Sequence, residues 1–245
     1  MVKLAHVICL GFLLTAACVG HTTQSFAQAR GTDRFEITSI KAVRPTLVKT
    51  VAALKKGDVA AAKTAFDEYD SEWTGIEVYI NTRDKAMYTD LEQNWQAKIN
   101  KGFAMPNPDA ATLLADTQML LTKYDDAIAM VEKGEPLNPL YDDVARLRIV
   151  RANLRDVTAA LKAGDIAKAR KSYSAFDHKW SSVQDLIKSR SQDAYNDVTK
   201  DMAQIKRALA ADKPDADQAG ALVKALTDKY NVVVTDVTKD ARAQK

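Results

Sequence analysis

Residues 54–91 read LKKGDVAAAKTAFDEYDSEWTGIEVYINTRDKAMYTDL, and residues 161–198 read LKAGDIAKARKSYSAFDHKWSSVQDLIKSRSQDAYNDV. The two stretches align without a gap. Twelve of their paired positions are identical, including Gly57/Gly164, Asp70/Asp177 and Trp73/Trp180. The match continues to Tyr124 and Tyr230, with one position fewer in the second copy. Self-similarity over most of a chain indicates a tandem duplication.

Large apolar residues in both copies follow the period of an α-helix. In the first copy they are Ala62, Phe66, Tyr69, Trp73, Ile76 and Ile80. In the second copy they are Ala169, Tyr173, Phe176, Trp180, Val183 and Ile187. Steps of four and three place each set on one helical face. The next helix has the stripe Tyr88, Leu91, Trp95 and Ile99. Because no segment alternates with a period of two, the sequence predicts an all-α fold of two tandem four-helix-bundle-like repeats.

Glycine, aspartate and proline mark the predicted ends of the helices. Gly57 and Gly164 can take a positive φ that ends one helix, and the aspartate after each can cap the next helix. The clearest linker contains a glycine and two prolines. The predicted organisation is a signal peptide (1–29), repeat 1 (30–133), a linker (134–140), repeat 2 (141–238) and a C-terminal tail (239–245).

The N-terminus has the pattern of a secretory signal peptide. A basic head at residues 1–3 precedes an apolar run at residues 4–18, and residues 27–29 (AQA) fit a cleavage site. The run is short for a membrane span. We therefore expect cleavage after residue 29, a periplasmic location and no transmembrane segment in the mature chain. Lipid attachment at Cys18 is the alternative, disfavoured by Thr15, where such sites usually carry leucine.

Charge and residue types exclude several classes of function. The 35 Lys and Arg residues against 32 Asp and Glu leave a formal net charge of only +3, which argues against a nucleic-acid partner. Removal of residues 1–29 leaves no cysteine and one histidine, His178. This excludes disulfides, cysteine-ligated zinc, iron–sulfur clusters and c-type haem, together with two-histidine metal sites.

Charged side chains beside the apolar stripe are the candidate ligand-binding residues. They are Asp70, Glu77, Arg83, Asp177, His178 and Arg190. Asp70 and Glu77 lie seven positions apart on one helix and form the candidate metal site, because carboxylates offer hard oxygen ligands to cations in helical bundles. The structural alternative is that the acids and arginines hold helices in register through charged hydrogen bonds. Gln184 replaces Glu77 in the second copy, so the two copies are not expected to bind alike.

Aromatic side chains are interpreted as core residues. Trp73 and Trp180 sit in the middle of the apolar stripe, and burial of their large surfaces is favoured over a role as a ligand platform. Tyr88 and Tyr195 can ligate ferric iron, but packing in the core is favoured for them too. His178 corresponds to a serine in the first copy and is expected to be exposed.

The repeated motif resembles the helical extracytoplasmic domain attached to bacterial high-affinity iron permeases. The motif runs A-L-x-x-G-D from Ala53, then through the aromatics to an I-E pair ending at Glu77, an arginine and Tyr88. The second copy spans residues 160–195. The resemblance implies a role in iron transport, with Glu77 at the family's acidic position and Gln184 departing from it. The chain has neither the permeases' transmembrane helices nor their R-E-x-x-E motifs, so the resemblance implies a free-standing relative. A weaker similarity to imelysin-type iron-uptake proteins fails because their H-x-x-E motif is absent.

Together these patterns predict a non-enzymatic periplasmic accessory or binding protein linked to metal-ion uptake. The expected ligand is iron or another cation, and the expected partner is a membrane iron permease or another envelope protein. No catalytic or nucleotide-binding motif supports an enzyme. Two alternatives remain open: a cell-envelope protein-interaction scaffold made of helical repeats, and a small-molecule sensor bundle. The sensor bundle predicts a cavity between the helices of one copy.

Overall fold

The computed structural model describes residues 34–244, and every regular element in that range is helical. The prediction of an all-α fold without a sheet is confirmed for these residues. The predicted signal peptide, its cleavage site and Cys18 lie outside the described residues. Within them, no helix combines the length and the apolar character needed to cross a membrane.

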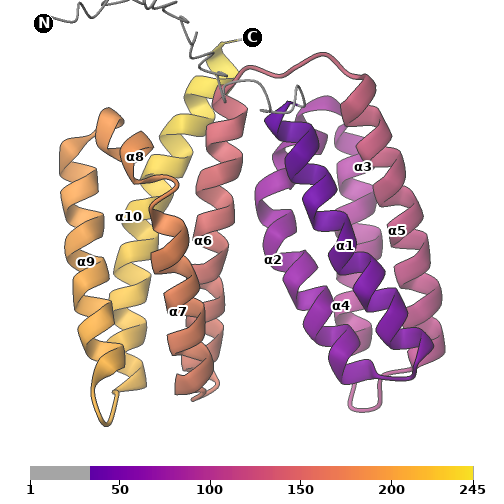
Figure 1. The fold of residues 1–245 in the computed structure, drawn as a ribbon, viewed down its shortest axis with the longest axis horizontal. Coiled ribbons are helices and arrows are strands. Elements are labelled where there is room, and N and C mark those ends of the chain that lie inside the picture. The colour runs from indigo at the N-terminus through magenta and orange to yellow at the C-terminus, as the bar shows by residue number, and fades with distance from the viewer. Residues whose placement is uncertain (1–33, 245) are drawn as a thin grey trace, which may run out of the picture. The chain divides into compact units, whose positions relative to one another are not determined.

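The helices form two groups along the chain, which we call the first and second bundles (Figure 1). The first bundle consists of α1 (Phe35–Lys55), α2 (Val59–Arg83), α3 (Lys85–Thr89), the π-helix η1 (Asp90–Gln96), α4 (Ala97–Phe103) and α5 (Ala110–Lys133). The second bundle consists of α6 (Leu140–Lys162), α7 (Ile166–Trp180), α8 (Gln184–Arg190), α9 (Gln192–Ala210) and α10 (Ala216–Ala243). The predicted linker spans the connection between α5 and α6.

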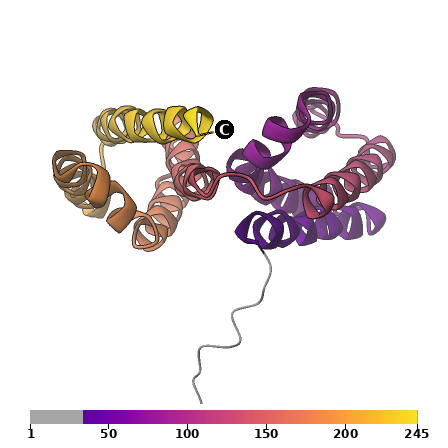
Figure 2. The same ribbon diagram turned by 90° about the horizontal axis from the view of Figure 1, so that it is seen from above.

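The helices of each bundle are grouped around a common centre (Figure 2), and the buried apolar side chains of both bundles belong to one hydrophobic cluster. In the first, α1 packs against α2 and α5; in the second, α6 packs against α7 and α10, and α10 packs against α9. The predicted stripe residues of α2 and α7 are buried, as are Val183 and Ile187 beyond α7. Trp73 and Trp180 are only 1% and 6% exposed, so the prediction that both lie in the core is confirmed.

The helix–helix corners follow the predicted glycine–aspartate chemistry. Gly57 and Gly164 have φ values of 73° and 71°, the left-handed region that glycine adopts without strain. The carboxylates of Asp58 and Asp165 then accept hydrogen bonds from the backbone N–H groups of Ala61 and Lys168, both at 2.9 Å. These corner predictions are confirmed, while the common origin of the two copies stays a sequence-based prediction.

One helix predicted for the second bundle is broken into two in the structure, so this prediction is wrong. The stripe of the second copy was expected to follow a single helix, but α7 ends at Trp180 and α8 begins at Gln184. The hydroxyls of Ser181 and Ser182 donate to the carbonyls of His178 and Lys179 at 3.0 and 2.6 Å. Serine side chains that bond to nearby carbonyls compete with the helical ladder, and this favours the break.

A π-helical turn explains where the two copies differ by one position. In the first bundle α3, η1 and α4 follow one another without a break, and η1 inserts an extra residue into this continuous helical segment. The corresponding helix of the second bundle, α9, is a regular α-helix. The buried positions therefore run Leu91, Gln96 and Ile99, a step of five followed by three. Trp95, a residue of the predicted stripe, is half-buried: it packs against the core and lies under Lys98. The extra residue places Trp95 at the edge of the core and Gln96 inside it.

Helix α2 also packs against α6, and this contact joins the two bundles. Gly75 marks the closest approach: a Cβ there would lie 2.2 Å from Cγ1 of Ile149 and 3.0 Å from the carbonyl oxygen of Ala145. Nearby, the Tyr79 hydroxyl donates to Asp142 at 2.9 Å. The described helices therefore form one compact unit.

Candidate functional site

Polar side chains gather around Trp73 in the interior of the first bundle. The indole Nε1 of Trp73 donates a hydrogen bond to the carboxylate of Glu92, which η1 directs toward α2. The ring of Tyr88 stacks on the indole, with ring centroids 6.5 Å apart and planes 4° from parallel. The π-helix thus brings a carboxylate to a tryptophan that would otherwise sit among apolar groups.

Asp70, one helical turn before Trp73, is held by side chains from three other elements, η1, α4 and α6. Its carboxylate accepts hydrogen bonds from the amides of Gln96 and Asn100, the latter at 3.2 Å, and pairs with Arg155 of α6 at 3.1 Å. Gln96 reaches Asp70 because the π-turn faces it inward. The side-chain Oε1 of Gln96 is buried and has no hydrogen-bond partner among the described residues.

Glu77 lies two turns further along α2 and faces α6. Its carboxylate pairs with the guanidinium of Arg148 at 3.0 Å, and both side chains are largely buried. Burial raises the pKa of Glu77 to about 7, against the opposing effect of Arg148, and the charge of Glu92 raises it further. Burial also raises the pKa of Glu92, although its hydrogen bond from Trp73 acts in the other direction.

Tyr69 points a buried hydroxyl toward these acids. The side chain is fully buried, and the hydroxyl has no hydrogen-bond partner among the residues that the structure describes. Burial raises its pKa well above the usual value, and the charges of Glu92, Asp70 and Glu77 add to the effect. We call Tyr69, Asp70, Glu77, Glu92 and Gln96 the polar cluster.

The second bundle lacks the polar cluster. Phe176 stands at the position of Tyr69, Gln184 at that of Glu77 and Thr199 at that of Glu92. The tryptophan and its stacked tyrosine remain, because Trp180 lies on Tyr195 with ring centroids 6.2 Å apart. The tryptophan–tyrosine stack is therefore present in both bundles, once beside Glu77 and Glu92 and once without counterparts of these two acids.

The predicted metal site at Asp70 and Glu77 does not fit a cation as the side chains lie. Each carboxylate is paired with an arginine of α6, and seven residues of helix separate the two by about 10 Å along the axis. In the described part of the chain, no group of three or more His, Cys, Asp or Glu side chains is placed to hold a metal ion. Metal binding at this pair stays a prediction.

The other predicted residues lie away from the polar cluster. Arg83 is nearly buried and pairs with Glu36 at 2.6 Å, while donating to the carbonyls of Tyr79 and Glu135, so it ties α1 and α2 to the chain after α5. Arg190 pairs with Asp240 of α10 at 2.8 Å. These contacts match the structural alternative for both arginines.

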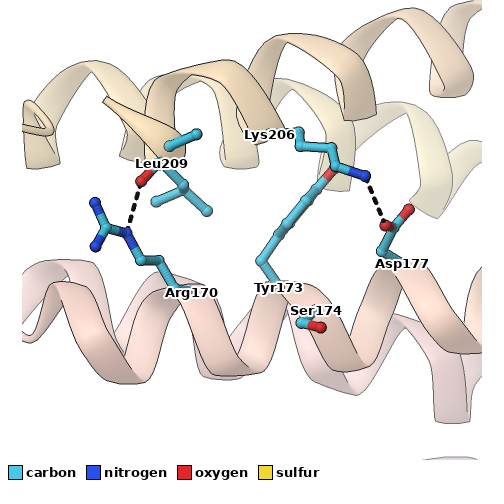
Figure 3. Close-up of a pocket in the computed structure, with 7 residues that line it drawn as sticks. Arg170, Tyr173, Ser174, Asp177, Lys206 and Leu209 are labelled. Carbon is cyan, nitrogen blue, oxygen red and sulfur yellow. Dashed lines mark hydrogen bonds and ion pairs between the residues drawn. The ribbon is translucent and has the colours of Figure 1, made fainter. Parts of the chain in front are cut away.

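Asp177 and His178 lie on α7 without contact with the first-copy acids. Asp177 pairs with Lys206 of α9 at 3.4 Å, at the rim of a hollow between the two helices (Figure 3). His178 is exposed, as expected. The structure therefore brings Asp70 and Glu77 into one region but separates them from the other four candidates.

The sequence alone does not single out Tyr69, Glu92 and Gln96, or the two arginines of α6. Tyr69 lies in the apolar stripe, where a tyrosine is usually a core residue. Glu92 and Gln96 lie next to the point where the two copies slip by one position, and this slip was the available signal for a distorted helix.

Comparison with known proteins adds no relative: no protein-family model matches the chain, and no curated protein or solved structure matches it significantly.

Proposed function

We propose that this protein is a non-enzymatic, extracytoplasmic binding component associated with metal-ion uptake, with iron as the ion. The polar cluster carries the proposal, because carboxylate and phenol oxygens are hard donors of the kind that hard cations prefer. The resemblance of residues 53–88 to the extracytoplasmic domain of iron permeases supports the choice of iron. The signal-peptide pattern supports a periplasmic location.

The cost of the polar cluster is the main support for a role beyond folding. A buried hydroxyl without a partner costs about 1–3 kcal/mol, and Tyr69 bears this cost whereas Phe176 does not. Burial also disfavours the charged forms of Glu77 and Glu92. The second bundle packs the same core without these groups, so the fold does not require them. Perturbed ionisable groups that the fold does not require are typical of functional sites.

Binding of a cation requires the arginines of α6 to move. Arg148 now occupies the carboxylate of Glu77 at 3.0 Å, and a cation would take its place. Burial raises the pKa of the Tyr88 hydroxyl, and the nearby charges of Glu77 and Glu92 raise it further, so Tyr88 and Glu92 are further oxygen donors close to Glu77. Because the pKa of Glu77 is about 7, protons compete with the cation, and affinity should rise as the pH increases toward neutrality.

Substitutions taken from the second bundle test the proposal without introducing foreign side chains. The variants are Tyr69→Phe, Glu77→Gln and Glu92→Thr, with Asp177→Asn as a matched control on α7. Titration calorimetry with ferric citrate and, without oxygen, with ferrous sulfate measures binding, and elemental analysis measures metal carried through purification. We expect Glu77→Gln to weaken binding at least about tenfold, which is about 1.4 kcal/mol, and Asp177→Asn to leave it unchanged. Absent binding, or equal binding by all variants, rejects the proposal.

A protein-interaction scaffold is the second candidate, favoured by a groove between α2, α6 and α7. The groove has a volume of about 690 Å³. Acidic side chains of α2 and basic side chains of α7 line its opposite sides: Asp67, Glu68 and Glu72, and Lys168, Lys171 and Lys179. Such a surface suits a partner segment that carries both signs of charge.

The effect of a chelator on partner binding distinguishes the metal-linked function from the protein-interaction scaffold. Affinity capture of envelope proteins, with and without a chelator, tests whether a partner needs the metal. A partner that is retained in chelator and lost in Lys171→Glu supports the scaffold. A partner that is lost in chelator supports the metal-linked function.

A further inference from the structure

A hollow opens between α7 and α9 of the second bundle. Its volume is about 270 Å³, just below the usual range of about 300–1,000 Å³ for small-molecule sites. Figure 3 shows Arg170 and Tyr173 rising from α7 toward α9, with Lys206 and Leu209 opposite them. The lining is an apolar floor with charged groups at the rim.

The hollow is lined by a smaller side chain than the one at the matching position of the first bundle. Leu209 stands where the first bundle has Phe103, whose ring packs on Phe66 with centroids 5.6 Å apart. Tyr173 stands where Phe66 does, and its hydroxyl is fixed by donating to the carbonyl of Met202 at 2.6 Å. The tyrosine cannot tilt without losing this bond. Tyr173 and Leu209 are only 5% and 3% exposed, and both line the hollow.

The charges at the rim also differ from those of the first bundle. There, Lys63 is neutralised by Asp67 at 2.7 Å. In the second bundle Arg170 replaces the lysine and Ser174 replaces the aspartate. The substitution removes a negative charge from the rim and leaves the cation on α7 without its acid neighbour.

Arg170 is held in place by α9. Its Nε donates to the carbonyl of Leu209 at 2.7 Å and its NH2 group donates to the carbonyl of Ala211 at 3.0 Å. A guanidinium has five N–H groups, so donors remain beyond these two bonds. The second cation on the rim is Lys206. Among the residues that line the hollow, Asp177 is its only acidic neighbour: the two side chains pair at 3.4 Å, and both are well exposed. The rim therefore carries two cations and one acid.

We propose that this hollow is a binding site for a small carboxylate with an apolar body, such as an aromatic or short aliphatic acid. The apolar body lies in the hollow against Leu209 and Ala210, and the carboxylate accepts hydrogen bonds from the guanidinium of Arg170. Lys206 adds positive charge at the rim. The site is independent of the metal-linked function proposed above, since it shares no residue with the polar cluster.

Benzoate is the probe, and benzyl alcohol is its uncharged control. Titration of the ¹⁵N-labelled protein, followed by ¹H–¹⁵N spectra, reports binding through the amide shifts of Lys206 and Ala210. We expect saturable shifts with benzoate and at least tenfold weaker binding of benzyl alcohol. Leu209→Phe should reduce benzoate affinity at least tenfold, because it introduces the larger side chain of the matching first-bundle position, Phe103, into the lining of the hollow.

Two further variants separate recognition from general charge and from misfolding. Arg170→Gln should weaken benzoate but leave the alcohol unchanged, whereas Arg207→Gln, an exposed arginine of α9 outside the hollow, should change neither. A thermal melt confirms that each variant folds. Three results would overturn the proposal: no saturable benzoate shift in the parent chain, unchanged binding by the Leu209→Phe variant, or equal losses in the two arginine variants.

Discussion

Replacement of Tyr69 by phenylalanine should make this protein more stable. The hydroxyl is completely buried and has no hydrogen-bond partner among the described residues, so folding removes its water without a compensating bond. Phenylalanine keeps the ring that packs against Trp73 and Tyr124, with centroids 6.0 and 5.9 Å away. The substitution therefore removes only the group that opposes folding.

The expected gain is about 1 kcal/mol in the free energy of unfolding. An unsatisfied buried hydroxyl costs about 1–3 kcal/mol. Removal of one oxygen leaves a void smaller than a methyl group, which gives back less than about 1 kcal/mol. For a chain of roughly 150–250 residues, a net gain of about 1 kcal/mol raises Tm by about 2–4 °C.

Urea denaturation followed by circular dichroism measures this difference, and Tyr124→Phe is the matched control. Tyr124 is equally buried, but its hydroxyl donates to the carbonyl of Ile40 at 2.7 Å. Its loss should cost about 1 kcal/mol. If Tyr69→Phe destabilises the protein as much as Tyr124→Phe does, the Tyr69 hydroxyl does not oppose folding.

Three other predictions concern helix packing, ionisation and capping. Gly75→Ala should destabilise the protein by about 1–3 kcal/mol, because the new Cβ meets Ile149; urea denaturation measures the loss. The raised pKa of Glu77 means that the folded state keeps a proton that the unfolded state loses, so stability should fall between about pH 4.5 and pH 7, by on the order of 2 kcal/mol. Glu77→Gln should remove this part of the pH dependence, as urea melts at several pH values would show. Asp58→Ala and Asp165→Ala should each cost about 1 kcal/mol, because each removes an equivalent helix cap, again measured by denaturation.

Clear results would contradict each of these three predictions. A Gly75→Ala variant as stable as the parent would mean that α2 and α6 do not approach closely. If the parent and the Glu77→Gln variant lose stability equally as the pH rises, Glu77 is not the titrating group. A loss in only one of the two capping variants would show that the corners are not energetically equivalent.

Much of the fold could be predicted because it depends on local sequence. Helical periodicity placed the core face of α2, and the glycine–aspartate pairs placed the corners with the expected backbone angles. The break after Trp180 was missed because two adjacent serines compete with the helical ladder, while the corresponding part of α2 stays helical against α6. The spacing of apolar residues along the sequence does not show whether a helix is stabilised by packing against another helix.

The candidate site was only partly predictable for a similar reason. Asp70 and Glu77 stood out because they are acids beside an apolar stripe, but their arginine partners come from α6, which is remote in sequence. A regular helix would leave Gln96 beside the stripe, and the π-turn brings it into the core while Trp95 packs at the edge. Tyr69 could not be distinguished from an ordinary core tyrosine until the surroundings of its hydroxyl were known.

Helix α6 makes buried or half-buried polar contacts with helices of both bundles. Its arginines neutralise acids of α2, while its Leu147 carbonyl accepts the buried hydroxyl of Tyr230 from α10 at 3.0 Å. Loss of either bundle would strand groups that the other has already desolvated. The two bundles should therefore unfold in a single transition. A ligand that shifts α6 in one bundle should also change the packing of α6 in the other bundle.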